Sequence, residues 1–313
     1  MKKILFLDSN HDVLHETLMN AGFRCDLFWD RSKEELIKLI PEYDAMVIRS
    51  KFKISREIID SALNLKCIGR VGAGMENIDV IYAESKGIKC LHAPEGNRDA
   101  VAEHVLGMLL MLFNNLKRAD NEVRTGIWKR HENRGFEICG KTVGIIGFGN
   151  MGSAFAQRLK GFECKILAYD KYKKNFGNEF VRESTMQELF DACDIVSLHI
   201  PYNNETDYLV NEKFINRFRK KVYFINSSRG KCLNTADLVK EIETGKVAGA
   251  CLDVLEYESV SFEDIDIANA PAPMKYLINS EKVVLSPHIA GWTHESKIKI
   301  AEILAEKIVR NFS

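Results

Sequence analysis

Short apolar runs alternate with amphipathic stretches through the first third of the chain. Strands of a parallel sheet are buried on both faces and read as continuous apolar runs, whereas apolar residues three or four apart predict helices that cover the sheet. The runs predicted to be strands are 4–7, 25–28, 45–48, 67–71 and 88–91, with helices near 10–20, 32–40, 55–63 and 77–86. This alternation predicts an α/β domain with a doubly wound parallel sheet.

The alternation resumes in the second half of the chain, after a longer apolar segment. Residues 97–116 have apolar side chains at helical spacing, among them Val101, Val105 and Leu109, which predicts one long helix that is buried all round. Core packing and a homodimer surface are both compatible with this pattern. Further strands are predicted at 143–146, 165–169, 194–199, 222–225, 248–252 and 283–286, and a final helix at 295–312.

A glycine motif follows the strand predicted at 143–146. Gly147, Gly149 and Gly152 have the spacing G-x-G-x-x-G at the start of a predicted helix. In a dinucleotide-binding unit the first glycine allows a tight turn, the second lets a pyrophosphate approach the backbone, and the third lets the helix pack on the strand. The helix then presents free N–H groups and its positive dipole end to the phosphates. The motif predicts a Rossmann-like nucleotide site, and a glycine turn without a dinucleotide is the alternative.

An acid at the end of the next predicted strand bears on the choice of cofactor. Asp170 lies 18 residues beyond Gly152, close to the ~20 at which an acid binds the ribose hydroxyls of NAD. Its charge also repels a 2′-phosphate, which favours NAD over NADP. Lys171, Lys173 and Lys174 follow directly and leave NADP open as the alternative.

The composition is that of an ordinary globular protein. The 313 residues are enough for two domains, and 46% of them are hydrophobic and 28% charged. With 44 basic and 44 acidic side chains, no excess charge points to nucleic acid. The eight cysteines form no C-x-x-C pair and no cluster with metal-ligand spacing, so we expect reduced thiols and no metal. No run approaches the ~18–20 apolar residues of a membrane helix, and we expect a cytoplasmic protein.

Two loops of the first domain follow strands at the edge where open α/β sheets bind ligands. One holds Arg49, directly after the strand at 45–48, and the other holds Gly72 and Ala73, after the strand at 67–71. An arginine at a strand end can clamp a carboxylate or phosphate, and successive backbone N–H groups can bind an anion. A solvated arginine and a simple turn are the alternatives, and these stretches by themselves do not decide.

Polar residues at strand ends of the second domain suit hydride transfer to a 2-keto acid. Arg229, Glu258 with Glu256 nearby, and His288 each follow a different predicted strand. The reaction needs a cation that holds the carboxylate and polarises the carbonyl, a group that gives up a proton near neutral pH, and a carboxylate that orients this group. Each residue alone has a structural alternative, such as an ion pair or a satisfied histidine. The combination in one nucleotide-binding domain favours an oxidoreductase.

Several ordered blocks are similar to those of a known family. They are Arg70-Val71-Gly72-Ala73-Gly74 through Asn77-Ile78-Asp79, Ala93-Pro94-Glu95-Gly96-Asn97 running into Val101-Ala102-Glu103-His104, the glycine motif at 144–152, Ser197-Leu198-His199-Ile200-Pro201 with Thr206, Asn226-Ser227-Ser228-Arg229-Gly230, Leu252-Asp253-Val254 and Ser286-Pro287-His288-Ile289-Ala290-Gly291. These blocks span nearly the whole chain and resemble the D-isomer-specific 2-hydroxyacid dehydrogenases. The resemblance implies two Rossmann-like domains that close on the substrate. A flavodoxin-like substrate-binding domain is expected at 1–97 plus 291–313, and an NAD-binding domain at 98–290.

The resemblance also implies roles for individual residues. Arg229 would bind the substrate carboxylate and carbonyl, His288 would be the acid/base, and Glu258 would pair with His288. The implied cofactor-binding residues are Gly147, Gly149, Asn150, Met151, Gly152, Asp170, His199, Ile200, Thr206, Ser227, Asp253 and Gly291, and the substrate-binding ones are Arg49, Arg70, Gly72 and Ala73. A homodimer through the helix at 97–116 is the expected assembly, with no nucleic acid and no membrane as partner.

Three features depart from the family pattern. Ser259 follows Glu258 where the family usually has proline, and the segment 260–282 is somewhat long. Both affect the expected loop geometry more than the chemistry. Asn150-Met151 stands where a basic-aliphatic pair is common, so one phosphate contact is expected to be missing.

The loop with Arg49 suggests a substrate. Arg49-Ser50 resembles the stretch of D-3-phosphoglycerate dehydrogenases in which an arginine helps to hold the phosphate. The leading hypothesis is therefore NAD-dependent interconversion of 3-phosphoglycerate and 3-phosphohydroxypyruvate, with serine biosynthesis as the pathway. The chain ends about one helix after His288, so no C-terminal regulatory domain is expected. A glyoxylate or hydroxypyruvate reductase, or another D-2-hydroxyacid dehydrogenase, is the alternative.

A protein of another class also stays open. The C-terminal-binding-protein corepressors, which sense NAD, resemble this family and keep the same arginine, glutamate and histidine. The three residues therefore do not exclude an NAD-sensing binding protein.

Overall fold

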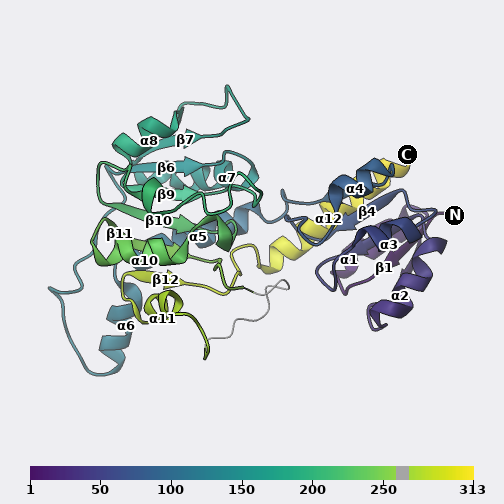
Figure 1. Ribbon diagram of the computed structural model, residues 1–313, viewed down its shortest axis with the longest axis horizontal. Coiled ribbons are helices and arrows are strands. Elements are labelled where there is room, and N and C mark those ends of the chain that lie inside the picture. Colours follow the sequence, from purple (N-terminus) through teal and green to yellow (C-terminus); the bar gives the residue numbers. More distant parts are fainter. Residues whose placement is uncertain (259–267) are drawn as a thin grey trace. The chain divides into compact units, whose positions relative to one another are not determined.

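The chain folds into two compact units, described here from a computed structural model that covers residues 1–258 and 268–313. Unit 1 comprises Met1–Arg98 and Trp292–Ser313, and unit 2 comprises Asp99–Gly291. The expected domain boundaries, 97/98 and 290/291, lie one residue before these two divisions. Each unit has its own parallel sheet with helices on both faces (Figure 1).

Unit 1 is built on a five-stranded parallel sheet with the order β2-β1-β3-β4-β5. Alternate residues of β1 point to opposite faces: Ile4 and Phe6 join a core with α1 and α12, while Leu5 belongs to a core with α2, α3 and α4. The strands are β1 (Lys3–Phe6), β2 (Arg24–Leu27), β3 (Ala45–Ile48), β4 (Cys67–Arg70) and β5 (Lys89–His92), and the helices are α1 (Asp12–Asn20), α2 (Lys33–Leu39), η1 (Ile40–Glu42), α3 (Arg56–Ser61), α4 (Val80–Ser85) and α12 (His294–Phe312).

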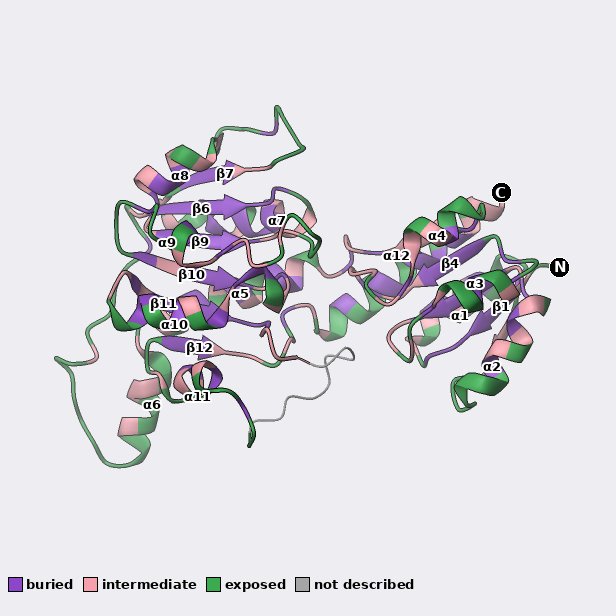
Figure 2. Cartoon of the chain, in the orientation of Figure 1, coloured by how far each residue is buried: buried purple, intermediate pink, exposed green. Residues whose placement is uncertain are grey.

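Unit 2 has a seven-stranded parallel sheet with the order β12-β11-β10-β9-β6-β7-β8. Its interior strands are almost entirely buried (Figure 2), with α5 and α7 on one face and α8 to α11 on the other. The strands are β6 (Thr142–Ile146), β7 (Lys165–Tyr169), β8 (Val181–Glu183), β9 (Ile195–Leu198), β10 (Val222–Asn226), β11 (Val247–Leu252) and β12 (Val283–Leu285). The helices are α5 (Arg98–Phe113), α6 (Leu116–Arg124), α7 (Asn150–Leu159), η2 (Lys160–Phe162), α8 (Met186–Ala192), α9 (Glu212–Ile215), η3 (Gly230–Cys232), α10 (Thr235–Glu243) and α11 (Ala272–Asn279).

The long helix expected at 97–116 is wrong at its end and in its burial. α5 stops at Phe113, because Asn115 adopts a left-handed conformation with φ 52° and α6 begins one residue later. Asparagine tolerates that conformation better than most residues, so it can end a helix although the apolar pattern continues. One stripe of α5, formed by Glu103, Gly107 and Met111, is exposed. An apolar composition therefore did not bury this helix on every side.

The two-sheet architecture agrees with the predicted fold class, and the strand at Val181–Glu183 is an addition to the predicted set. Among the residues that the structure describes, no helix is both long and apolar enough to cross a membrane.

Candidate active site

The glycine motif forms a tight turn at the carboxyl end of β6. Gly147 has φ +92°, and a Cβ there would lie 2.3 Å from the carbonyl oxygen of His199. A Cβ on Gly152 would lie 2.1 Å from the carbonyl oxygen of Gly147, so the start of α7 can approach the turn only with glycine there. A Cβ on Gly149, in contrast, would meet no atom within 4 Å. The turn thus leaves open space at the position where a pyrophosphate would approach the backbone.

The start of α7 and a hydroxyl beyond β10 also fit a dinucleotide. Gly149 is the N-cap of α7 and has no capping side chain, and Asn150 and Met151 form the first turn. This leaves N–H groups of the first turn for an anion. The hydroxyl of Ser227, beyond the end of β10, is buried yet has no hydrogen-bond partner among the described residues. A buried polar atom without a partner is costly and indicates a place for a ligand atom.

Asp170, at the end of β7, is held as a carboxylate. One oxygen accepts the N–H of Phe148 at 2.8 Å, and the other accepts those of Tyr172 and Lys173 at 2.9 and 2.8 Å. Partial burial favours the neutral form, but these three N–H groups outweigh it and lower the pKa of Asp170. The negative charge expected at the adenosine ribose is therefore built into the turn.

The three lysines after Asp170 all have partners within unit 2. Lys171 pairs with Glu205 at 2.7 Å. Lys173 and Lys174 donate to the backbone carbonyls of Phe148 and Asp170, each at 3.3 Å. These contacts, together with the Asp170 carboxylate, favour NAD over a cofactor that carries a 2′-phosphate.

Three neighbouring strands bring the predicted catalytic residues to one edge of the sheet. β10, β11 and β12 are adjacent and parallel, and Arg229, Glu258 and His288 follow them in turn. The backbone of Arg229 is held by Asn226, whose side-chain amide donates to the carbonyl of Arg229 at 3.0 Å. A Cβ on Gly230 would lie 2.0 Å from the carbonyl oxygen of Leu255, so the loop with Arg229 packs directly against the loop that leads to Glu258.

Glu258 and His288 form a close pair. Glu258 Oε2 lies 2.7 Å from His288 Nδ1, and the two side chains are 14% and 23% exposed. An ionised carboxylate can only accept, so the proton lies on Nδ1 and Nε2 is the nitrogen that can exchange a proton with a substrate. The backbone N–H of Leu255 donates to the other oxygen of Glu258. The geometry is that of an acid/base histidine oriented by a carboxylate.

The neighbouring Glu256 has a structural task instead. It accepts the hydroxyl of Tyr208 and the N–H of Thr235, both at 2.9 Å. The hydrogen bond to Glu256 is the main reason that the pKa of Tyr208 is raised to about 12. Of the two glutamates after β11, Glu258 is the one whose carboxylate is hydrogen-bonded to His288.

His288 has a backbone conformation that few residues adopt. Its φ is 55°, and its N–H donates to the carbonyl of Asp253 at 2.7 Å. The Asp253 carboxylate, 1% exposed, accepts the N–H groups of Ile289 and Ala290, each at 2.9 Å. Such strain persists only where neighbouring bonds hold it, and it is frequent at active sites. Asp253 thus holds the turn that carries the histidine.

In unit 1 the loop at 49–51 is filled by an acid. Asp8, just beyond β1, accepts the N–H groups of Arg49, Ser50 and Lys51 on one oxygen, at 2.6, 3.1 and 3.2 Å. The guanidinium of Arg49 lies 5.7 Å from the ring of Trp292. Any anion bound at this loop would therefore contact the Arg49 side chain and not these N–H groups. The sequence analysis did not assign this role to Asp8. The signal that could have found it is an acid just beyond a predicted strand.

The loop at 72–74, in contrast, has no side chain among the described residues that occupies its backbone N–H groups. Gly72 has φ +140°, and the N–H groups of Gly72, Ala73 and Gly74 donate no hydrogen bond within the described part of the chain. His92, at the end of β5, supports the turn, with Nδ1 2.6 Å from the carbonyl oxygen of Ala73. Arg70 lies beside it and donates from Nη1 to the carbonyl of Val71 at 3.1 Å. Successive open N–H groups of this kind can bind a carboxylate.

Of the remaining predicted cofactor residues, His199, Ile200 and Thr206 lie beyond the end of β9 and Gly291 lies beyond β12. The Nε2 atom of His199 is 2.8 Å from the Ser197 hydroxyl, and burial lowers the pKa of His199 to about 3. Thr206 donates to the carbonyl of Pro201 at 2.7 Å, which closes the loop after Ile200. Gly291 is the last residue of unit 2. Ser259 and the first part of the segment 260–282 lie outside the described residues.

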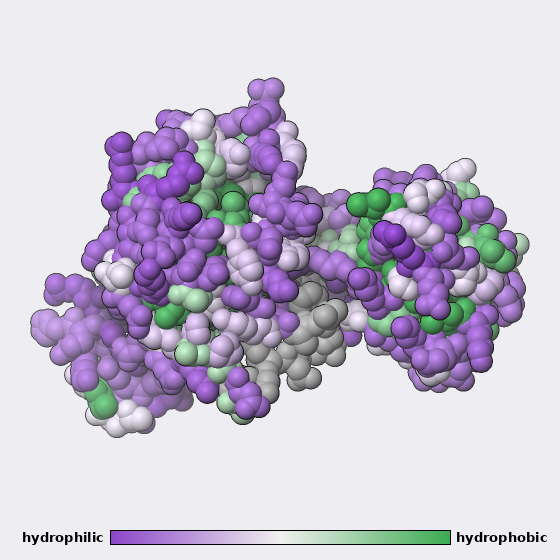
Figure 3. All heavy atoms as spheres, viewed as in Figure 1, coloured by the Kyte–Doolittle hydropathy of each residue, from purple (hydrophilic) through white to green (hydrophobic). Residues whose placement is uncertain are grey.

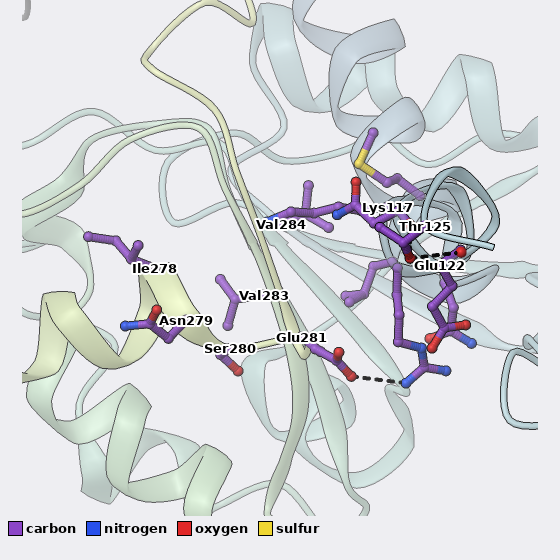
Figure 4. A pocket seen from close by; sticks show the side chains of 14 residues that line it. Lys117, Glu122, Thr125, Ile278, Asn279, Ser280, Glu281, Val283 and Val284 are labelled. Carbon is purple, nitrogen blue, oxygen red and sulfur yellow. Dashed lines mark hydrogen bonds and ion pairs between the residues drawn. The ribbon is translucent and has the colours of Figure 1, made fainter. Parts of the chain in front are cut away.

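A pocket lies elsewhere in unit 2 (Figure 4). It has a volume of about 280 Å³ and lies among the end of α5, α6, α11 and β12, with Met111, Glu122 and Val284 in its wall. Arg118 and Glu281 form an ion pair there at 3.1 Å. None of the predicted site residues lines it.

Comparisons with known proteins agree with this architecture. The D-3-phosphoglycerate dehydrogenase of Archaeoglobus fulgidus is 34% identical over 309 residues, which cover 98% of this chain but only 56% of that protein. The hydroxypyruvate reductase of Thermotoga maritima is 37% identical over 280 residues, which cover 89% of this chain and 88% of that protein. The chain thus spans about half the length of the first relative and most of the second.

A solved structure and a family model extend the comparison. The D-lactate dehydrogenase of Aquifex aeolicus, complexed with NAD and lactic acid, has a TM-score of 0.81 at 28% identity and covers 99% of this chain and 95% of its own. The model of the NAD binding domain of the D-isomer specific 2-hydroxyacid dehydrogenases matches residues 106–290. This match confirms the predicted NAD cofactor. The chain belongs to the family of D-isomer-specific 2-hydroxyacid dehydrogenases.

Proposed function

We propose that the protein transfers a hydride between NAD and C2 of a D-2-hydroxy acid or its 2-keto acid. The observation that carries this proposal is the Glu258–His288 pair at 2.7 Å, on a strained turn that Asp253 holds. In the direction of keto acid reduction, C2 receives the hydride and the carbonyl oxygen receives a proton. NADH, when bound, supplies the hydride.

Each residue of the pair and the nearby arginine has a distinct task in this proposal. His288 gives the proton from Nε2 to the carbonyl oxygen, because Nδ1 is bonded to Glu258. Glu258 keeps the imidazole oriented and stabilises its charged form before the transfer. Arg229 binds the substrate carboxylate and polarises the carbonyl, a task that a guanidinium suits because it can donate two parallel hydrogen bonds.

The proposed substrate pair is 3-phosphoglycerate and 3-phosphohydroxypyruvate. Support comes from Arg49 with Arg70 in unit 1, whose guanidinium groups suit a phosphate, and from the open N–H groups at 72–74, which suit a carboxylate. The Archaeoglobus relative bears the matching name. The reductase of Thermotoga favours the alternative, an unphosphorylated keto acid such as hydroxypyruvate or glyoxylate.

The experiment compares NADH oxidation with phosphohydroxypyruvate, hydroxypyruvate, glyoxylate and pyruvate in the wild type and in Arg49→Ala. We expect phosphohydroxypyruvate to be the best substrate and Arg49→Ala to raise its KM about tenfold or more, as for a lost charge-assisted hydrogen bond. The KM of the unphosphorylated acids should change little. Arg56→Ala, which removes an exposed arginine of the same unit, is the matched control. A better unphosphorylated substrate with no effect of Arg49→Ala would assign the protein to the reductases and remove serine biosynthesis as its pathway.

The NAD-sensing alternative is tested by His288→Ala. An enzyme loses most of its turnover with every 2-keto acid in this variant, while NADH binding, followed by fluorescence, persists. A sensor shows no turnover in the wild type either. Only the enzyme proposal requires a large ratio of wild-type to variant activity.

We also propose that the protein forms a homodimer through unit 2. Besides the exposed stripe on α5, large apolar side chains are exposed on and after α6, namely Leu116, Val123, Ile127, Trp128 and Phe136. In the view of Figure 3 the surface around α6 is mostly hydrophilic, with a small hydrophobic area. Exposed large apolar side chains of this kind are typical of a protein interface. Light scattering should give twice the chain mass, and Trp128→Glu should shift it towards the monomer, while a monomeric wild type contradicts the proposal.

A further inference from the structure

A chain of hydrogen bonds leads from α5 to the turn that carries His288. His104 and Met108 lie one helical turn apart on α5, and both contact Ser286, the residue after β12. The hydroxyl oxygen of Ser286 is 2.9 Å from His104 Nε2 and 2.7 Å from Asp253 Oδ1. Residue 104 thus contacts a side chain 182 positions away in the sequence.

The chemistry of His104, Ser286 and Asp253 decides which group donates in each of these hydrogen bonds. An ionised carboxylate cannot donate, so Ser286 gives its single proton to Asp253. The 3.6 Å contact of this hydroxyl with the Met108 sulfur is a weak competitor. The lone pairs of Ser286 then accept, and His104 must donate to them from Nε2. Because each bond polarises the next, the donation from His104 strengthens the bond that Ser286 makes to Asp253.

Asp253 connects these hydrogen bonds to the turn that carries His288. It is 1% exposed, so no solvent replaces a lost partner. Its carboxylate holds the N–H groups of Ile289 and Ala290, and its carbonyl holds the N–H of His288. Since His288 has φ 55°, its ring direction depends on these bonds. A small rotation of Asp253 would turn the imidazole away from Glu258 or from the substrate.

We propose that His104 and Ser286 are positioning residues, which act through Asp253 to hold His288 in the geometry for proton transfer. This inference rests on the proposed function, because it assumes that His288 transfers a proton. Neither residue is assigned a role in the reaction by the motifs that identify the site.

The experiment compares variants that keep a donor with variants that remove it. His104→Gln keeps an N–H at nearly the position of Nε2, whereas His104→Leu has none; Ser286→Thr keeps the hydroxyl and Ser286→Ala lacks it. The readouts are the single-turnover rate of NADH oxidation with a keto acid, the Kd of NADH from fluorescence, and the ring resonances of His288 in cofactor-free protein. His294→Asn, an exposed histidine in the other unit, is the control.

We expect His104→Leu and Ser286→Ala to lower the single-turnover rate about tenfold, as for a lost hydrogen bond that acts on a charged group. The Kd of NADH should stay within about twofold in all variants, and the conservative variants should recover most of the rate. The double variant should lose about as much as the more damaged single variant and less than the product of the two losses, because both residues act on Asp253, and His104 Nε2 also lies 3.5 Å from its Oδ1. The His288 resonances should shift only in the variants that lack the donor.

Two results would overturn the inference while leaving the proposed function intact. One is an unchanged rate in His104→Leu. The other is an equal loss in His104→Leu and His104→Gln together with unshifted His288 resonances, which would indicate a general packing role. A wild type without turnover on any 2-keto acid would instead overturn the proposed function. The resonance shifts would still report whether the hydrogen bonds from His104 through Ser286 and Asp253 control the position of His288.

Discussion

Two loops of unit 1 follow neighbouring strands, but among the described residues the backbone N–H groups of one have an acceptor and those of the other do not. The loop at 49–51 follows β3 and the loop at 72–74 follows β4, and these strands are neighbours in the sheet. Asp8 occupies three N–H groups of the first loop, whereas those of the second loop have no acceptor within the described residues. The sequence pattern made both loops equal candidates for binding an anion. The structure separates them into a loop that the protein has filled and a loop that stays open.

This difference separates strand-end loops whose N–H groups are used within the protein from those whose N–H groups can bind a ligand. In unit 2, Asp170 accepts N–H groups of its own turn and of the glycine turn, and Asp253 accepts those of the turn after β12, much as Asp8 does for the loop after β3. A buried or partly buried acid at a strand end therefore makes a turn rigid and aims the side chains on it, such as Arg49 and His288. The open N–H groups at 72–74 are then the backbone groups best suited to a substrate anion.

The largest effect is expected from removing the acid that fills the first loop. Asp8→Ala leaves three N–H groups without an acceptor, and at about 1 kcal/mol for each hydrogen bond the loss of stability is about 3 kcal/mol. Urea unfolding measures this change. Asp8→Asn is the matched control, because it keeps an acceptor oxygen and should lose much less. Equal losses in the two variants would show that the charge, and not the filling of the loop, matters.

A smaller effect is expected from closing the second loop. Gly72→Ala places a Cβ at φ +140°, 1.6 Å from Arg70 Nη1, so the guanidinium must move and the backbone is strained by about 2 kcal/mol. The KM of the keto acid should rise while the Kd of NADH stays unchanged. Gly161→Ala is the control, since its Cβ would meet nothing within 4 Å. An unchanged KM would mean that the open loop binds no substrate.

The smallest effect concerns pH and the filled turn at Asp170. Three N–H groups outweigh partial burial and lower the pKa of Asp170 in the folded protein, so its contribution to stability is complete above about pH 4 and is lost as the pH falls through the folded pKa. Asp170→Asn should be less stable than the wild type by about 1 kcal/mol at pH 7, and this difference should shrink below about pH 4. Thermal unfolding from pH 7 to pH 3 tests this. A constant difference would show that the carboxylate charge is not what the turn uses.

The sequence by itself indicated every strand except β8, each to within about one residue at its end. Buried parallel strands need continuous apolar residues, and the glycine motif needs Gly147 and Gly152 for steric reasons that act over a few residues. For the same reason Arg229, Glu258 and His288 could be placed at strand ends of one domain without a structure, whereas the structure showed that these strands are neighbours. The fold class and the cofactor followed from such local rules.

Only the tertiary structure decided which acids fill which turns and where α5 ends. Local residue patterns do not separate Glu256 from Glu258, and only the family resemblance pointed to Glu258; in the structure the first contacts Tyr208 and the second His288. Asp8 meets a loop 41 residues away, and His104 meets Ser286 across 182. Such contacts depend on the order of strands in the sheet and on where each helix packs. Hydrogen bonds between distant segments leave no periodic pattern, because their partners are set by the fold as a whole and not by neighbours in the chain.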